Sequence, residues 1–146
     1  RPPISTLFPY TTLFRSILGY FGNITVANGY VNNLNTNVFE WRDSPLERSE
    51  FPAIVVNDVS NETTEDAPVR TLNLEIIVVN QGNTSPAQIR SMAQDVLTAF
   101  SQIEAVAGVT AAGFERIEID VEKEEKRTAA ATIYAFVDYA AADWEI

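Results

Sequence analysis

The most regular pattern in this chain is the alternation of apolar and polar positions from Val69 to Asn80. The apolar side chains of one face come at even positions, Leu72, Leu74, Ile76 and Val78. A period of two places alternate side chains on opposite faces of a strand, so the pattern predicts a strand with one buried face. The odd positions are polar at first and then become apolar at Ile77 and Val79. We expect that end of the strand to be covered on both sides.

Four further stretches are predicted to be extended. Two precede the strand above, Val38–Trp41 and Ala53–Val59, and Pro52 suits the start of the second because it has no N–H to give to a sheet. Two lie near the end of the chain, Phe114–Glu122 and Thr128–Tyr139. They are separated by a charged turn and are predicted to pair as an antiparallel hairpin. Residues 60–68 read as an acidic loop.

A helix is predicted from Pro86 to about Ala105. Its apolar residues recur at three- and four-residue spacing, which draws one stripe along a helix: Ile89, Met92, Val96, Phe100 and Ile103. Ser85 can cap the helix, Pro86 suits its first position, and Gln88 can complete a capping box.

These elements predict an α+β fold with a mostly antiparallel or mixed sheet of about five strands, because strands and helices do not alternate regularly. One long helix, and the remnant of an N-terminal helix over Ile17–Ile24, are expected to pack on the sheet. The chain length of 146 residues suits one domain, which we assign to residues 17–146. Residues 1–16 resemble translated sequencing-adapter read-through and are expected to be non-native.

The charge of the chain is strongly negative and uneven. The formal net charge is −10, and all twenty acidic residues lie from Glu40 onward. A negative surface disfavours binding to nucleic acid and to anionic membranes. We therefore expect no sequence-specific nucleic-acid partner and no membrane partner.

Composition removes most catalytic chemistry. The chain has no cysteine and no histidine, so thiolate metal sites and the usual general base near neutral pH are absent. No phosphate-binding glycine loop and no nucleophile motif occurs. We expect no catalytic residue, no cofactor, no metal and no enzymatic activity.

Two groups of residues are candidates for contacts with partners. Aromatic side chains near loops suit protein interfaces, although core packing is an equal alternative for each: Tyr30, Phe39, Trp41, Phe51, Tyr139 and Trp144. Three acids alternate along one predicted strand, Glu118, Asp120 and Glu122. They are expected to form a solvated strand face, and could also line the wall of a pore.

Several segments together resemble the tail terminator, or tail-completion, proteins of long-tailed bacteriophages, the group of the minor tail protein U. The matching segments span most of the chain: Ile24–Tyr30 (ITVANGY), Phe51–Val56 (FPAIVV), the strand Leu72–Val79, the helix Ile89–Phe100 and the closing Val137–Tyr139. Head–tail connection proteins show similar patterns. The family's N-terminal helix is the point of departure, because residues 1–16 take its place here.

The resemblance implies a structural virion protein, present in the host cytoplasm during assembly and then at the tail end of the particle. Such a protein caps the tail tube as a homo-oligomeric ring, expected to be a hexamer, which ends tail polymerisation and joins tail to head. Its partners would be the tail-tube protein and a head-completion or connector protein. An acidic ring also suits a lumen through which DNA passes without binding.

Three other functions stay open. The chain could be a head–tail connector, or neck protein, of the same fold. It could be a module that binds a peptide by adding it to an exposed sheet edge. It could also be a metal-dependent hydrolase that uses the acids of the predicted loop, Asp58, Glu62, Glu65 and Asp66, which we rank last.

Overall fold

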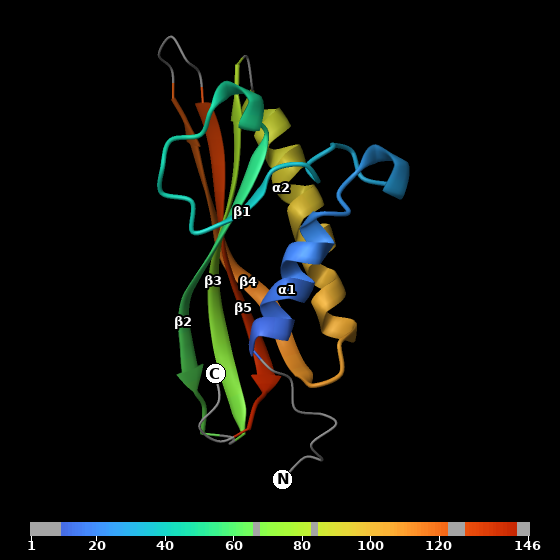
Figure 1. Cartoon of the computed structure of the whole chain (residues 1–146), viewed down its shortest axis with the longest axis vertical. Coiled ribbons are helices and arrows are strands. Elements are labelled where there is room, and N and C mark those ends of the chain that lie inside the picture. The colour runs from blue at the N-terminus through green and yellow to red at the C-terminus, as the bar shows by residue number, and fades with distance from the viewer. Residues whose placement is uncertain (1–9, 66–67, 83–84, 123–127, 143–146) are drawn as a thin grey trace.

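A computed structural model of the chain describes residues 10–65, 68–82, 85–122 and 128–142. The two α-helices lie on one side of a single sheet (Figure 1). The helical elements are α1 (Tyr10–Phe21), η2 (Val26–Asn28), η3 (Arg48–Glu50), α2 (Pro86–Phe100) and η4 (Ser101–Ala105). The strands are β1 (Val38–Glu40), β2 (Ala53–Thr63), β3 (Val69–Gln81), β4 (Val109–Val121) and β5 (Thr128–Ala140). The α+β fold class predicted from the sequence is confirmed.

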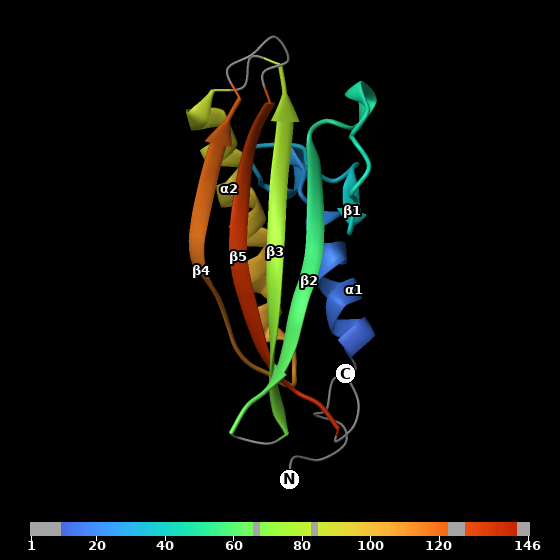
Figure 2. The same ribbon diagram turned by 90° about the vertical axis from the view of Figure 1, so that its left-hand side faces the viewer.

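The five strands form one mixed sheet in the order β1-β2-β3-β5-β4. β1 runs parallel to β2, and every other pair is antiparallel. β4 and β5 pair as the predicted hairpin, with Ile117 opposite Ile133. Figure 2 shows the four long strands side by side with the helices behind them.

Helix α2 begins where the capping signals placed it. The Gln88 N–H donates to the Ser85 hydroxyl, and the Ser85 N–H donates to the Gln88 side chain, so two unpaired donors of the first turn are satisfied. The apolar stripe is buried, including Ile89 and Val96. The last predicted turn tightens into η4, and Gly108 follows with a φ of 94°.

The first helix, α1, begins at Tyr10 and ends at Phe21, so it includes residues of the segment set aside as non-native. Leu13 is fully buried, and Phe14 is 6% exposed and stacks on Tyr10 with ring centroids 6.3 Å apart. Residues 10–16 therefore contribute to the core of this chain, whatever their origin. Residues 1–9 lie outside the described residues.

The core fills the space between the helices and one face of the sheet. It contains the even positions of β3 and the odd positions of β5, as the alternation predicts, with Ile76 opposite Ile133 at the centre. The other face of β3 is partly covered near its end. Ile77 and Val79 are half-buried there, beside Val55 and Ala53 of β2, which are buried.

Two strands are longer than the sequence pattern indicates. β2 continues to Thr63, so residues 60–63 are strand and not the predicted loop. β4 begins at Val109, five residues before the predicted start at Phe114. Each strand contains a register irregularity, at Val59 in β2 and at Thr110 and Glu115 in β4. Such bulges interrupt the period of two on which the prediction depends.

Candidate functional site

One face of the sheet carries no helix, and we call it the open face (Figure 2). Its central row joins four strands, with Asn57 opposite Glu75, Glu75 opposite Tyr134 and Tyr134 opposite Arg116. The next row runs from Val55 through Ile77 and Thr132 to Glu118. The open face is therefore polar along β4 and more apolar towards β2.

The solvated strand face predicted for the end of β4 is confirmed. Glu118, Asp120 and Glu122 are all exposed, and register places Glu118 and Asp120 on the open face opposite Thr132 and Ala130. Glu122 follows the last residue of β4. The three carboxylates thus form an acidic margin at one side of the open face.

Among the described residues, the cation that lies beside this margin is Arg116. The Arg116 guanidinium lies 3.9 Å from the ring centroid of Tyr134, and its Nε donates to Glu118 Oε1 at 3.1 Å. The Tyr134 hydroxyl donates to the other oxygen of Glu118, also at 3.1 Å. Since Arg116 and Glu118 are more than half exposed, the ion pair contributes little to stability and mainly orders the surface.

β4 is the outermost strand of the described sheet, so one of its edges has no strand beside it. Phe114 is 49% exposed and Ile119 is 40% exposed. Both lie opposite residues of the buried face, Ala135 and Ala131, so they belong to the helix-facing side of β4. A long free edge bordered by exposed apolar side chains is a surface on which another chain can dock.

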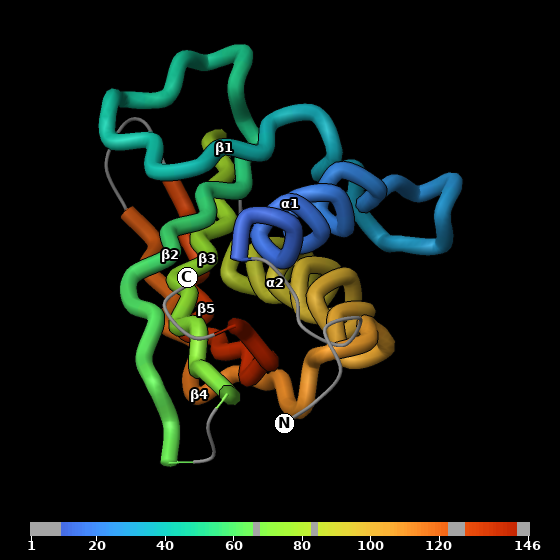
Figure 3. Tube along the Cα trace, turned by 60° about the horizontal axis from the view of Figure 1, so that its bottom comes forward, coloured from blue at the N-terminus to red at the C-terminus, as the bar shows by residue number. Residues whose placement is uncertain are grey.

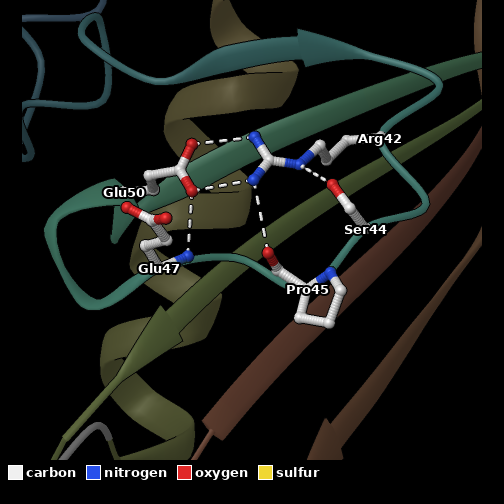
Figure 4. A network of polar contacts seen from close by, with 5 residues as sticks. All are labelled: Arg42, Ser44, Pro45, Glu47 and Glu50. Atoms are coloured by element: carbon white, nitrogen blue, oxygen red, sulfur yellow. Dashed lines mark hydrogen bonds and ion pairs between the residues drawn. The ribbon is translucent and has the colours of Figure 1, made fainter.

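At the opposite side of the sheet, the connection from β1 to β2, residues 41–52, lies beside the edge formed by these two strands and extends away from the helices (Figures 2 and 3). Arg42 links several residues of this connection by hydrogen bonds (Figure 4). Its guanidinium donates two hydrogen bonds of 2.8 Å to the Glu50 carboxylate, one to Ser44 and one to the Pro45 carbonyl. The same guanidinium lies 4.9 Å from the ring centroid of Phe39.

The Glu50 carboxylate is held in its charged form. Two-point hydrogen bonding from Arg42 lowers the pKa of Glu50, and the hydrogen bond from the Glu47 N–H lowers it further. The pair is about one-fifth exposed. The connection is therefore a fixed part of the surface near neutral pH.

The six predicted interface aromatics do not come together. Trp41 is 55% exposed, has a φ of 50°, and donates from its indole N–H to Asp58. Tyr30, Phe39 and Phe51 are half-buried, and the Tyr30 hydroxyl accepts from Gln102. Trp144 lies outside the described residues.

The interface prediction is wrong for Tyr139. Its side chain is fully buried in the core, and its hydroxyl accepts a 2.9 Å hydrogen bond from the Asn61 side-chain amide. Burial raises the pKa of Tyr139 above its ordinary value. The reason for the error is that β5 continues to Ala140, so Tyr139 follows the buried odd positions of the strand and does not begin an exposed tail.

The acids proposed as a metal site are also separated. Because of the bulge at Val59, Asp58 lies opposite Leu74 of the buried face, whereas Glu62 lies opposite Thr71 of the open face. Within the ranges that the structure describes, no three acidic side chains are grouped to hold a metal ion. Asp66 is outside those ranges. Asp58 and Glu62 therefore do not face one common site in this structure.

A shallow hollow beside the start of β4 offers little chemistry. It is lined by Glu104, Val109, Thr110, Ala111 and Ala112, so one carboxylate stands among small side chains and backbone.

No described helix is long and apolar enough to cross a membrane.

Sequence reasoning missed one buried acid and the loop that it holds. Asp95 of α2 is 5% exposed, and its carboxylate accepts from the backbone N–H groups of Val31 and Asn32 and from the Asn32 side chain. These residues belong to a segment that extends away from the helices (Figures 1 and 3), residues 22–35, which we call the projecting loop. The signal was present, since Asp95 follows Met92 of the apolar stripe by three residues and so lies near the same face of the helix.

No family model matches the chain, and no curated protein matches it closely enough to be a relative.

Proposed function

We propose that the protein is a non-catalytic structural component of a phage particle that caps the tail tube as an oligomeric ring. In this role it ends tail polymerisation and joins tail to head, as the resemblance of its sequence segments to tail terminator proteins implies. Its partners are further copies of itself, the tail-tube protein and a head-completion or connector protein. The protein would act in the host cytoplasm during assembly and then at the tail end of the virion.

The observation that carries the proposal is the free edge of β4. Thirteen residues of strand, Val109–Val121, lie at the margin of the sheet with Phe114 and Ile119 exposed beside them. An unpaired strand of this length favours association with another chain unless charge or shape blocks it. A ring of identical subunits would cover such a surface in every copy.

The acidic margin supports the same role. If Glu118, Asp120 and Glu122 line the lumen of the ring, their charges repel the phosphates of DNA in transit. Among the described residues of this margin no basic stripe is available to bind nucleic acid, because Arg116 is engaged by Tyr134 and Glu118. The lumen assignment is part of the proposal.

The same free edge favours one alternative of a different class, a module that adds a peptide to β4 as a further strand. A head–tail connector of the same fold is the nearer alternative, and it too would form a ring. Solution mass distinguishes the peptide-binding module from a ring-forming protein. The choice between tail-tube protein and connector protein as binding partner distinguishes the tail terminator from the head–tail connector.

Light scattering over a wide range of protein and salt concentration tests the proposal. We expect a hexamer, or a monomer that forms rings when tail-tube protein is added. A ring that binds connector protein and ignores tube protein would assign the connector role. A strict monomer that binds extended peptides and does not respond to tube protein would overturn the proposal in favour of the peptide module.

A further inference from the structure

The tip of the projecting loop exposes apolar side chains on an ordered backbone. Val31 is 73% exposed, the largest value among the large apolar side chains of the described chain, and Val26 is 55% exposed, as is Trp41. At the base of the loop, Ile24 and Leu34 are buried in the core and joined by a 2.9 Å hydrogen bond from the Leu34 N–H to the Ile24 carbonyl. The loop is thus anchored at both ends.

Hydrogen bonds within the loop fix its shape. The Thr25 hydroxyl caps η2 by accepting from the Asn28 N–H, Gly29 takes a φ of 94°, and the Asn33 side chain accepts from the Val26 N–H at 2.8 Å. The Asp95 carboxylate accepts hydrogen bonds from the backbone N–H groups of Val31 and Asn32, which fixes the second half of the loop to α2. A loop ordered before binding loses little conformational entropy when it docks, so its exposed valines are suited to a contact.

The loop also lies in the part of the chain that carries no charge. From Ser16 to Phe39 there is no Asp, Glu, Lys or Arg, although the whole chain has a net charge of −10. Two copies of so acidic a protein repel each other over most of their surfaces. An uncharged surface avoids this repulsion, and it is where a second copy can approach most closely.

A second uncharged surface lies along the free edge of β4. On the helix-facing side, the register places four apolar residues in the second half of the strand, Phe114, Ile117, Ile119 and Val121, which we call the edge strip. The opposite side of the same strand carries Arg116, Glu118 and Asp120. Glu115 is exposed at the bulge and has no partner in the register, so the charges of β4 assigned to a face lie on the open face, and the four side chains of the edge strip are uncharged.

From these two surfaces we infer that the projecting loop of one copy docks on the edge strip of another copy of the same chain. The inference rests on the proposed self-assembly and names its contact: Val26 and Val31 pack against Phe114 and Ile119. The loop and the strip are different surfaces of the protomer (Figures 1 and 3), so the contact is head-to-tail and can be repeated around a closed ring.

Because the chain contains no cysteine, single introduced cysteines report on this contact directly. Val31→Cys and Ile119→Cys proteins are mixed under mild oxidation at concentrations where light scattering shows oligomers. We expect a disulfide-linked pair between the two variants. In the matched control, Val31→Cys is mixed with Ser49→Cys, an exposed position in the connection between β1 and β2, and we expect no linked pair.

A charge substitution provides a second readout. Val31→Asp is expected to weaken self-association about tenfold or more, because it places a carboxylate in an apolar contact. Val59→Asp is the matched control, since Val59 is 49% exposed and lies in neither surface, and its association is expected to equal that of the unmodified chain.

The outcomes separate this inference from the proposed function. If rings form but Val31→Asp assembles normally, or Ser49→Cys links as readily as Ile119→Cys, the contact is wrong and the ring-forming role stands. If the unmodified chain stays monomeric at every concentration and with tube protein present, both are overturned.

Discussion

The carboxylate of Asp95 fixes Asn32 by two hydrogen bonds, one of 2.8 Å from the backbone N–H and one of 2.9 Å from the side-chain amide. It joins residues 63 positions apart in the sequence and connects α2 to the projecting loop. A buried carboxylate with such donors is satisfied, and removing it leaves those donors without a partner.

We therefore expect Asp95→Ala to destabilise the protein by about 3 kcal/mol, measured by urea denaturation. Faster hydrogen exchange at the Val31 and Asn32 amides would show that the loop is released. Asp120→Ala, at an exposed position, is the control and is expected to change stability by less than about 0.5 kcal/mol. Unchanged exchange at both loop amides in Asp95→Ala would contradict the assigned anchor.

The Asn61–Tyr139 hydrogen bond predicts a coupled pair. Tyr139→Phe removes the acceptor of the Asn61 amide, whose Oδ1 is already buried without a partner, so we expect a loss of about 1–2 kcal/mol. Adding Asn61→Leu removes the stranded amide and should recover part of that loss. Thermal or urea unfolding of the two single variants and the double variant gives the coupling. Strictly additive effects would mean that the hydrogen bond contributes nothing.

The Arg42–Glu50 pair predicts a pH dependence. Because the pKa of Glu50 is lowered in the folded chain, its stabilising contribution is complete above the ordinary glutamate pKa of about 4.3. The contribution is lost as the pH falls through the lower, folded value. In Arg42→Gln the Glu50 pKa should rise, as seen by NMR titration, and the stability difference from wild type should narrow in acid. Arg48→Gln, at an exposed position nearby, should leave the Glu50 pKa unchanged.

The buried start of α1 predicts that residues 10–16 matter for folding. Leu13→Ala removes a fully buried side chain, and we expect it to lower the free energy of unfolding by about 2–5 kcal/mol. Arg15→Ala, on the exposed side of the same helix, should have little effect in the same urea titration. Equal stability of the two variants would show that the first turns of α1 do not pack in solution.

The acidic margin predicts a change in DNA binding. Replacing Glu118, Asp120 and Glu122 together by Lys should leave folding intact, since all three are exposed, but should make assembled rings bind double-stranded DNA in a salt-dependent way. A control triple at Glu40, Glu47 and Glu104 makes the same change in net charge at other exposed positions. Equal DNA binding by the two triple variants would contradict the assignment of Glu118, Asp120 and Glu122 to the lumen.

The sequence predicted the elements whose periodicity is uninterrupted. β3, β5 and α2 were placed within a few residues, because Leu72 to Val78 and Ile89 to Phe100 repeat with the period of their structure. β2 and β4 were predicted to be too short, because bulges interrupt their period of two. The start of α1 was missed because residues 1–16 were set aside for their resemblance to adapter read-through, so their apolar pattern was not considered.

Long-range contacts could not be predicted in the same way. Nothing local to Tyr139 shows that Asn61 lies across the sheet, and nothing local to Asp95 identifies Asn32 as its donor. An acid on an apolar stripe does indicate that some donor must be supplied, because a buried carboxylate without one is unstable. Proximity to loops failed as a guide to interface aromatics, since Arg42 covers Phe39 and the core encloses Tyr139.

The bulge at Val59 decides which residues in the second half of β2 face the helices. Up to Asp58 the even positions face the helices, and beyond Val59 the odd positions do, which brings Asn61 to the buried face where Tyr139 lies. If β2 ran on without the bulge, with Val59 in a regular position of the ladder, the even positions would face the helices along the whole strand. Asn61 would then turn out of the core, and Asp58 and Glu62 would share one face. One additional residue in a strand therefore decides which polar groups are internal and which are available to solvent.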